Sequence, residues 1–178
     1  MLSSKASATR TDTNVKIHPT ADVDQGAAIG AGTTIWNWTK VREGASIGSG
    51  VSIGQHVYVD TNVQIGDRCK IQNTVNIFDG VVVGSDVFIG PSATFTNDRH
   101  PRAVGEWQVS HTVVEDRASI GANATIVCGV TLGAGCMVGA GSVVTKDVAP
   151  GVLVVGNPAR PIGNAPPPKR VRRVGDES

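Results

Sequence analysis

The residues best suited to chemistry gather between residues 96 and 113, in the stretch TNDRHPRAVGEWQVSHTV. A histidine can act as a general base near neutral pH, and His100 stands close to Asn97 and Asp98. The Asn97 amide could orient a reacting group of the substrate. Asp98 could attract an ammonium ion and help to remove its proton, although capping a turn would suit this residue nearly as well. These three residues are the catalytic candidates.

Around this stretch the chain follows a six-residue repeat. From Ile17 every sixth residue is large and apolar as far as Phe95, and the same step resumes from Val114 to Val144, giving 20 hexads. The residue four places later is small or β-branched in 19 of them, which indicates a tight inward position. The residue three places after each apolar residue is often Gly, Asn or Asp, the residue types that a turn with a left-handed backbone conformation favours. Each hexad is too short for a helix and a strand, so the repeat predicts an all-β, parallel β-helix.

Residues 96–113 break this repeat, and we expect them to form one extruded loop. A long insertion in a rigid scaffold is a natural place for function, although a tolerated surface loop is the alternative. Trp107 favours function, because a lone large aromatic residue on a loop usually packs against a ligand or a partner.

Composition and charge limit the possible classes of protein. The 178 residues suit one domain, and 22 glycines with 4% aromatic residues do not suit a conventional α/β core. A net charge of +1 gives no reason to expect nucleic acid or an anionic membrane as a partner. No signal-peptide core or membrane span is recognisable, so we expect a cytoplasmic protein.

Three cysteines are present, and none of them has the spacing of a zinc ribbon or a disulfide framework. Cys69 and Cys136 occupy the small inward position of the repeat and are expected to be inert core thiols, while Cys128 lies at a turn position. We therefore expect no bound metal.

The hexad pattern resembles that of the hexapeptide-repeat transferases, as in Ile47-Gly48-Ser49-Gly50-Val51 and Val138-Gly139-Ala140-Gly141-Ser142. This resemblance, and not the periodicity, implies a left-handed β-helix with three hexads per coil and a triangular cross-section. Twenty hexads would then make about six to seven coils. The β-helix domain is expected at 17–160, between an N-terminal extension at 1–16 and a proline-rich basic tail at 161–178.

The end of the repeat resembles the signature of hexapeptide acyltransferases that use a coenzyme A thioester. The matching segments are Gly139 to Val148, GAGSVVTKDV, and Gly156-Asn157-Pro158-Ala159-Arg160. The resemblance implies acetyl-CoA as cosubstrate, with its pantetheine arm against backbone N–H groups of Ala122 and Ala140, one coil apart. It also implies that Lys146 and Arg160 meet the anionic end of the coenzyme. Alternatively, GNPAR is only a terminating cap.

Residues 17–162 further resemble bacterial N-acetyltransferases of nucleotide-linked 3-amino sugars. The matching segments are Ile17-His18-Pro19-Thr20-Ala21, Ile35-Trp36, Lys70-Ile71-Gln72-Asn73, Gly90-Pro91-Ser92, Phe95-Thr96-Asn97, Pro101-Arg102 and Ile120 to Gly129. Thr74 and Ile89 depart from the pattern and leave the sugar, the amino position and the nucleotide open. The resemblance implies N-acetylation of a nucleotide-linked amino sugar, UDP-linked in that family, for surface polysaccharide or lipopolysaccharide. It also implies a homotrimer with active sites between subunits.

An amine nucleophile needs less help from a base than a hydroxyl does, so His100 is not required for N-acetylation. If the loop replaces no hexads, the turn position of Ala122 and Ala140 continues back to Pro91 and Asn73. Asn73 is therefore a substrate-binding candidate, with Asn76 as a weaker one and Arg102 as the arginine of the matching loop motif.

Three other functions stay open. An O-acetyltransferase of the same fold would use His100 as its base. A γ-type carbonic anhydrase shares the β-helix, but the H-x4-H pair is missing because His100 and His111 are eleven residues apart. A purely structural β-helix is the third. The basic stretch KRVRR in the tail could touch a phosphate or a neighbouring chain, or be a solvated tail.

Overall fold

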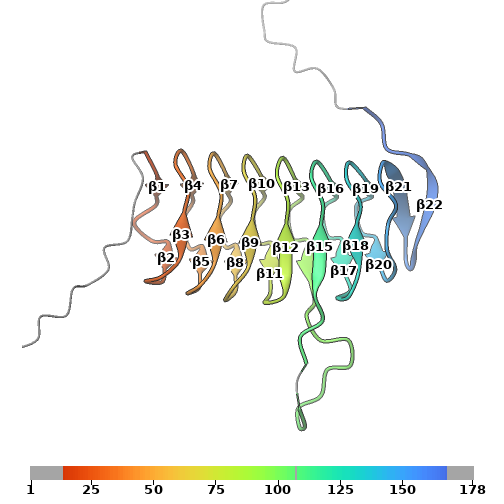
Figure 1. Cartoon of the computed structure of the whole chain (residues 1–178), viewed down its shortest axis with the longest axis horizontal. Helices are drawn as coiled ribbons and strands as arrows, with labels where there is room; N and C mark the ends of the chain where they lie inside the picture. The colour runs from red at the N-terminus through yellow and green to blue at the C-terminus, as the bar shows by residue number, and fades with distance from the viewer. Residues whose placement is uncertain (1–13, 107, 168–178) are drawn as a thin grey trace, which may run out of the picture.

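The structure is a computed structural model that describes residues 14–106 and 108–167. These residues form 22 β-strands and no helix, and the strands stack into a solenoid (Figure 1). Hence no helix in the described ranges could cross a membrane. Trp107, most of the N-terminal extension and the KRVRR stretch lie outside the described residues.

The strands belong to three sheets, named A, B and C here, and successive strands along the chain, except the last two, belong to A, B and C in turn. Sheet A comprises β1 (Lys16–Ile17), β4 (Thr34–Ile35), β7 (Ser52–Ile53), β10 (Lys70–Ile71), β13 (Phe88–Ile89), β16 (Ser119–Ile120), β19 (Met137–Val138), β21 (Val152–Gly156) and β22 (Ala159–Asn164). Sheet B comprises β2 (Asp22–Val23), β5 (Lys40–Val41), β8 (Tyr58–Val59), β11 (Asn76–Ile77), β14 (Thr94–Phe95), β17 (Thr125–Ile126) and β20 (Val143–Val144). Sheet C comprises β3 (Ala28–Ile29), β6 (Ser46–Ile47), β9 (Gln64–Ile65), β12 (Val81–Val83), β15 (Thr112–Val114) and β18 (Thr131–Leu132).

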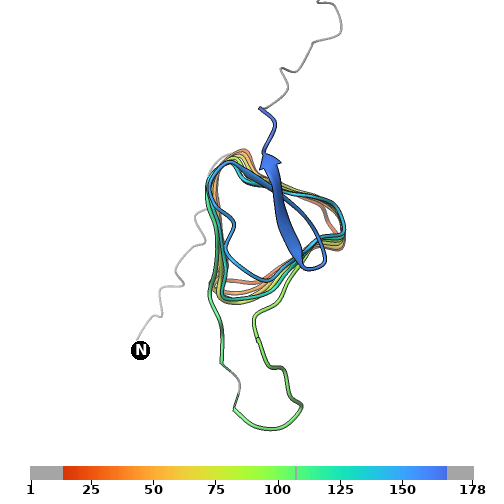
Figure 2. The ribbon, with the colours of Figure 1, turned by 90° about the vertical axis from the view of Figure 1, so that its right-hand side faces the viewer.

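Three hexads make one coil, and the coils superpose as a triangle when viewed along the axis (Figure 2). This is the expected left-handed β-helix of hexapeptide repeats. The solenoid has about eight turns, because β21 pairs with β19 and adds a layer beyond the 20 hexads. The turns between sheets form three corners, which we call the A–B, B–C and C–A corners.

The slender core follows directly from the repeat. The apolar residue that ends each hexad strand points inward, and those from Ile35 to Val144 are buried. The small position is buried too, including Cys69 and Cys136, while Cys128 is buried at its turn. The turn position takes a positive φ even where the residue is neither Gly, Asn nor Asp, as at Trp38 and His56. Pairing of the coils therefore outweighs local turn preference at these sites.

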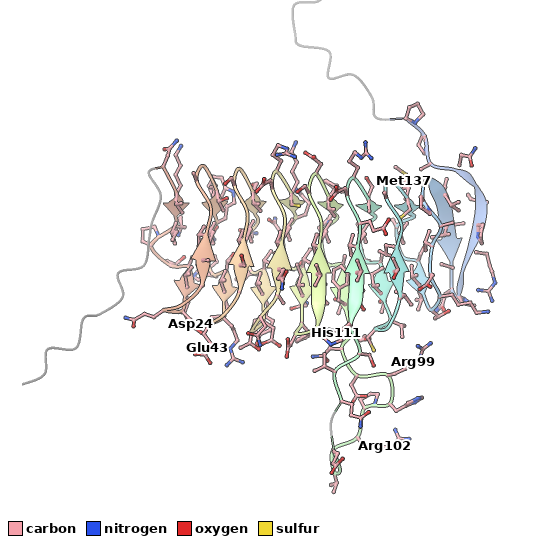
Figure 3. All side chains as sticks on the ribbon, viewed as in Figure 1. Asp24, Glu43, Arg99, Arg102, His111 and Met137 are labelled. Atoms are coloured by element: carbon pink, nitrogen blue, oxygen red, sulfur yellow. The ribbon has the colours of Figure 1, made fainter. Side chains whose placement is uncertain are left out.

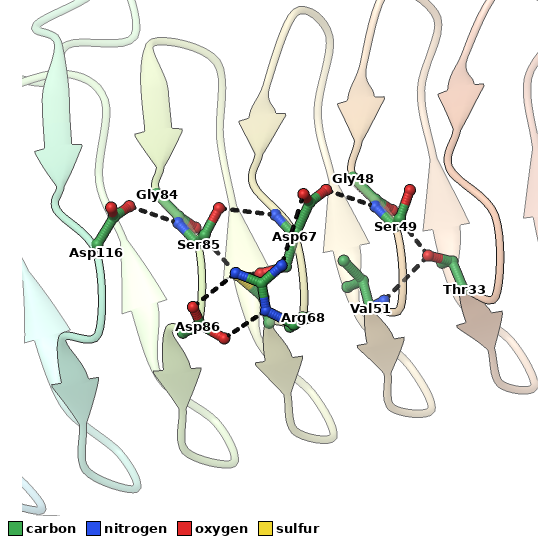
Figure 4. A network of polar contacts seen from close by, with 11 residues as sticks. Thr33, Gly48, Ser49, Val51, Asp67, Arg68, Gly84, Ser85, Asp86 and Asp116 are labelled. Carbon is green, nitrogen blue, oxygen red and sulfur yellow. Dashed lines mark hydrogen bonds and ion pairs between the residues drawn. The ribbon is translucent and has the colours of Figure 1, made fainter.

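The C–A corner shows how polar side chains hold successive coils together (Figure 4). The Asp67 carboxylate accepts a hydrogen bond from the Ser49 amide at 2.8 Å, and Asp116 does the same for the Ser85 amide at 2.8 Å. Arg68 donates two hydrogen bonds of 2.8 Å to the two carboxylate oxygens of Asp86. These contacts join neighbouring coils and make the scaffold rigid at this corner.

The loop leaves the scaffold at the B–C corner, between β14 and β15 (Figures 1 and 2). Phe88 on β13 pairs with Ser119 on β16, which lies 31 residues later in the sequence. Where no loop intervenes, the corresponding residues of neighbouring coils are 18 residues apart. Because β13 still pairs with β16 and β14 with β17, the loop replaces no hexad.

The C-terminal end of the stack is covered by an antiparallel hairpin of β21 and β22. Strand β22 runs to Asn164, and the Ala165 amide then donates to the Gly151 carbonyl at 2.7 Å. Strand β22 thus extends beyond residue 160, the predicted end of the β-helix domain, into the predicted tail at 161–178.

Candidate functional site

The neck of the loop is fixed to three consecutive coils by hydrogen bonds. The Ser110 amide donates to the Asn97 carbonyl at 2.9 Å and ties the two limbs together. On the next coil, the Cys128 amide donates to Thr96 Oγ1 at 2.9 Å and the Gly129 amide donates to Thr112 Oγ1 at 3.2 Å. On the preceding coil, the Gly80 carbonyl accepts from the Thr112 amide at 2.9 Å. The loop therefore starts and ends at defined positions.

The catalytic candidates Asn97, Asp98 and His100 lie at the outgoing limb of this neck. Asn97 is half-buried, and the Asp98 carboxylate accepts a hydrogen bond from the backbone amide of His100 at 2.8 Å. This is the turn-capping contact that competed with a catalytic role for Asp98. The His100 ring is exposed and lies beyond the neck. Arg102 is exposed further out, where its guanidinium donates to the Pro101 carbonyl at 3.0 Å (Figure 3).

The coenzyme and substrate candidates Asn73, Ala122 and Ala140 lie at another corner, the A–B corner. Backbone hydrogen bonds place them in one column with Pro91. The Ser92 amide donates to the Asn73 carbonyl, the Asn123 amide to Pro91 and the Gly141 amide to Ala122, at 2.8–2.9 Å. The register predicted by counting hexads is confirmed, while the roles of these residues stay predictions.

In this column Ala122 is half-buried and Ala140 is exposed. In the described part of the chain neither amide N–H donates to a protein acceptor, whereas the equivalent amide of Gln55 donates to Asn73 Oδ1 at 3.1 Å. At Ala122 the difference arises because Ala140, at the same place on the next coil, has no side-chain acceptor. Beside Ala140 a largely apolar hollow of about 310 Å³ is lined by Phe88, Met137 and Gly121, among others. Two free N–H groups on successive rungs next to this hollow could hold a slender chain that carries carbonyl oxygens.

Lys146 and Arg160 come together at the C-terminal end of the molecule. Both line a hollow of about 380 Å³ beside the β21–β22 hairpin, with Asp147 and several apolar residues. Lys146 belongs to the B–C corner, so this cationic pair is separate from the hollow beside Ala140. A lysine and an arginine in one hollow suit a phosphate group.

One chain therefore divides the candidate residues between two corners. Sheet B lies between the A–B corner, which carries Ala122 and Ala140, and the B–C corner, which carries the loop. Asn76 begins strand β11 on this intervening sheet and is half-buried. Its side chain donates to the Thr74 carbonyl at 3.5 Å.

The thiols of Cys69 and Cys136 take no part in this arrangement. Burial raises the pKa of the Cys136 thiol to about 11 and raises the pKa of Cys69 as well. Both groups are protonated at neutral pH and are poor nucleophiles. Among the described residues no group of three or more His, Cys, Asp or Glu side chains is placed to bind a metal ion.

The sequence reasoning gave no role to two exposed tryptophans at the A–B corner. The Trp36 side chain is half-exposed and Trp38 stacks on His56, with ring centroids 5.0 Å apart. A signal was present, because two of the three tryptophans of an aromatic-poor chain lie two residues apart.

Comparison with known proteins supports the repeat. Residues 44–79 match the family model of the bacterial transferase hexapeptide (six repeats), and residues 111–146 match that of the hexapeptide repeat of succinyl-transferase. The two matches lie on either side of the loop.

The chain is also similar to a curated N-acetyltransferase and to a curated bifunctional protein. It is 44% identical over 79 residues to 2,3,4,5-tetrahydropyridine-2,6-dicarboxylate N-acetyltransferase of Staphylococcus carnosus, covering 44% of this chain and 31% of that protein. It is 44% identical over 55 residues to the bifunctional protein GlmU of Rubrobacter xylanophilus, covering 31% of this chain and 12% of that protein. The chain spans less than half the length of these curated relatives.

A solved structure gives a longer match. The hexapeptide-repeat acetyltransferase VCA0836 of Vibrio cholerae, solved with acetyl coenzyme A, is 28% identical with a TM-score of 0.50. The match covers 83% of this chain and 72% of that one. The repeat models match on both sides of the loop, and the chain is similar to a named N-acetyltransferase and to a solved hexapeptide-repeat acetyltransferase.

Proposed function

We propose that the protein is an acetyl-CoA-dependent N-acetyltransferase that acts on a nucleotide-linked amino sugar. The observation that carries the proposal is the pair of free N–H groups at Ala122 and Ala140, on successive coils beside an apolar hollow. A pantetheine arm has amide carbonyls to accept from such groups and a slender apolar chain to fill the hollow. The likeness to a β-helix solved with acetyl coenzyme A supports this donor.

An amine acceptor suits the polar groups of the loop neck. A neutral amine attacks the thioester carbonyl carbon, the C–N bond forms, the C–S bond breaks, and the amine proton leaves with the thiolate or to water. Asn97 can orient the amine or the carbonyl from its half-buried position, and no strong base is needed. Relatives that carry N-acetyltransferase in their names are in keeping with an amine acceptor.

The proposed reaction needs two copies of the chain. Asn97 and the Ala122–Ala140 groove lie at different corners with sheet B between them, so one copy does not bring them together. A homotrimer places the B–C corner of one copy against the A–B corner of the next, which completes three equivalent sites. Acetyl-CoA and nucleotide sugars as substrates place the reaction in the cytoplasm, with surface polysaccharide or lipopolysaccharide as the destination of the product.

The donor half of the proposal is tested by acetyl-CoA binding. Ala140→Trp fills the hollow beside the free N–H groups, and we expect calorimetry to show at least about a tenfold weaker affinity for acetyl-CoA. The matched control is Ala134→Trp at the C–A corner, where the amide already donates to Glu115 at 2.7 Å. Equal affinity in the two variants would place the coenzyme elsewhere.

The acceptor half is tested by thiol release from acetyl-CoA with a panel of nucleotide-linked amino sugars and the matching hydroxy sugars. We expect release with an amine, gain of one acetyl group on its nitrogen by mass spectrometry, and none with the hydroxy sugars. His100→Ala should keep most of the activity, and Asn97→Ala should lose about tenfold or more in turnover. Activity with a hydroxyl acceptor that disappears in His100→Ala would instead establish the O-acetyltransferase.

A further inference from the structure

A second hollow lies at the A–B corner, nearer the N-terminus than the proposed thioester groove. It measures about 380 Å³ and is lined by Trp36, Asn37, Ser52, Gly54, Gln55, Ile71, Gln72 and Asn73. No charged side chain lines it. Its chemistry is that of one indole and four carboxamides, so it suits an uncharged ring that forms hydrogen bonds at its edge.

The carboxamides have unused hydrogen-bonding capacity. Asn73 Oδ1 accepts a hydrogen bond from the backbone N–H of Gln55 at 3.1 Å, and Gln55 Oε1 accepts one from Asn37 Nδ2 at 3.5 Å. Among the described residues, Asn73 Nδ2 and Gln55 Nε2 donate to no protein acceptor. One end of each amide is therefore held by the protein, and the donor end is free to meet a ligand.

The indole supplies the face that the amides lack. Trp36 has 50% of its surface exposed although it lines the hollow. On the next coil, a Cβ at Gly54 would lie 2.5 Å from Asn73 Oδ1, so only glycine leaves this carboxamide in place. Trp38, two residues after Trp36, already stacks on His56 and does not line the hollow. The free aromatic face at this place is thus that of Trp36.

We propose that this hollow binds the base of the nucleotide-linked acceptor. The base stacks on Trp36, and its edge forms hydrogen bonds with the side chains of Asn73 and Gln55. The inference rests on the proposed function. Gln55, Asn73, Pro91 and Ala122 follow one another on successive rungs of one column. At about 4.8 Å per rung, Gln55 lies roughly 14 Å from Ala122, a span that a nucleoside diphosphate with its sugar can cover. The base would then anchor one end of the acceptor while the amine reaches the thioester.

The test is calorimetric titration of the full-length protein with UDP, dTDP and GDP. We expect one of them to bind, and Trp36→Ala to weaken that binding at least about fivefold, as loss of a stacked base does. Asn73→Asp keeps an oxygen that accepts from the backbone N–H of Gln55 but removes the free Nδ2 donor, so it should weaken nucleotide binding as well. Trp38→Ala removes an indole of the same corner outside the hollow and should bind like the unaltered protein.

Three results would overturn the inference: no binding of any of the three nucleotides, equal weakening by Trp36→Ala and Trp38→Ala, or displacement of the bound nucleotide by coenzyme A. The last would assign the hollow to the adenine of the coenzyme. Failure of the proposed function gives a different outcome. Trp36-dependent nucleotide binding without any thiol release from acetyl-CoA would leave the base site standing and refute the transferase.

Discussion

At the scale of single residues, the inward positions are the most constrained. Cys136 is buried in the small position of its hexad, and burial raises its pKa to about 11 from an ordinary value of 9.0. The unfolded chain loses this proton first as the pH rises. The folded state therefore loses stability from about pH 9 to about pH 11, and below pH 9 this contribution is fully present.

We expect Cys136→Ala to flatten this part of the pH profile. Urea unfolding of both proteins between pH 7.5 and 10.5 gives the difference in their free energies of unfolding at each pH. The contributions of the other titrating groups cancel in this difference because both proteins contain them. The variant should be less stable at neutral pH by about 1 kcal/mol because a buried sulfur is lost. Parallel pH profiles of the two proteins would show that the thiol does not titrate with folding.

The sequence predicts the inward residues well, because the period of six fixes which side chains enter the core. It predicts single turn residues less well. Trp38, His56 and Thr74 take positive φ against their own preference, and Cys128 is buried at a turn. The pairing of coils on both sides determines these conformations, and one hexad does not contain that information.

At the scale of elements, the neck of the loop depends on a glycine of the preceding coil. A Cβ at Gly80 would lie 2.3 Å from Val109 Cγ1 and 3.5 Å from His111 Nδ1, both on the returning limb. The sequence predicts where the loop leaves the repeat. It could not predict this contact, because Gly80 and Val109 meet only through the path of the returning limb.

We expect Gly80→Ala to displace the returning limb and reduce turnover in the thiol-release assay. Gly26→Ala is the matched control: it stands at the same corner with φ +93° against +88°, and nothing lies within 4 Å of its Cβ. Both variants should lose about 1–2 kcal/mol of stability from backbone strain. Only Gly80→Ala should lose activity, and the double variant Gly80→Ala/Val109→Ala should recover it. Equal turnover of the two single variants would show that the position of the returning limb does not affect catalysis.

At the scale of the whole molecule, the β-helix separates the groups that the proposed reaction must combine. The rigid coils hold the Ala122–Ala140 groove at one corner and the loop neck at another. The family resemblance predicts sites between subunits, and the positions of these corners give a physical reason for them. The hexad period alone could not provide that reason, since it does not show that three hexads make one coil.

The most direct test combines two impaired variants. Ala140→Trp blocks the groove but keeps the loop, and Asn97→Ala impairs the loop but keeps the groove. Co-expressed with different affinity tags and purified as mixed assemblies, they should regain activity, because one of the three interfaces in any mixed trimer joins an intact groove to an intact loop. Thiol release near a third of the unaltered rate per site is the predicted result. Mixed assemblies no more active than either variant alone would contradict a site shared between two copies.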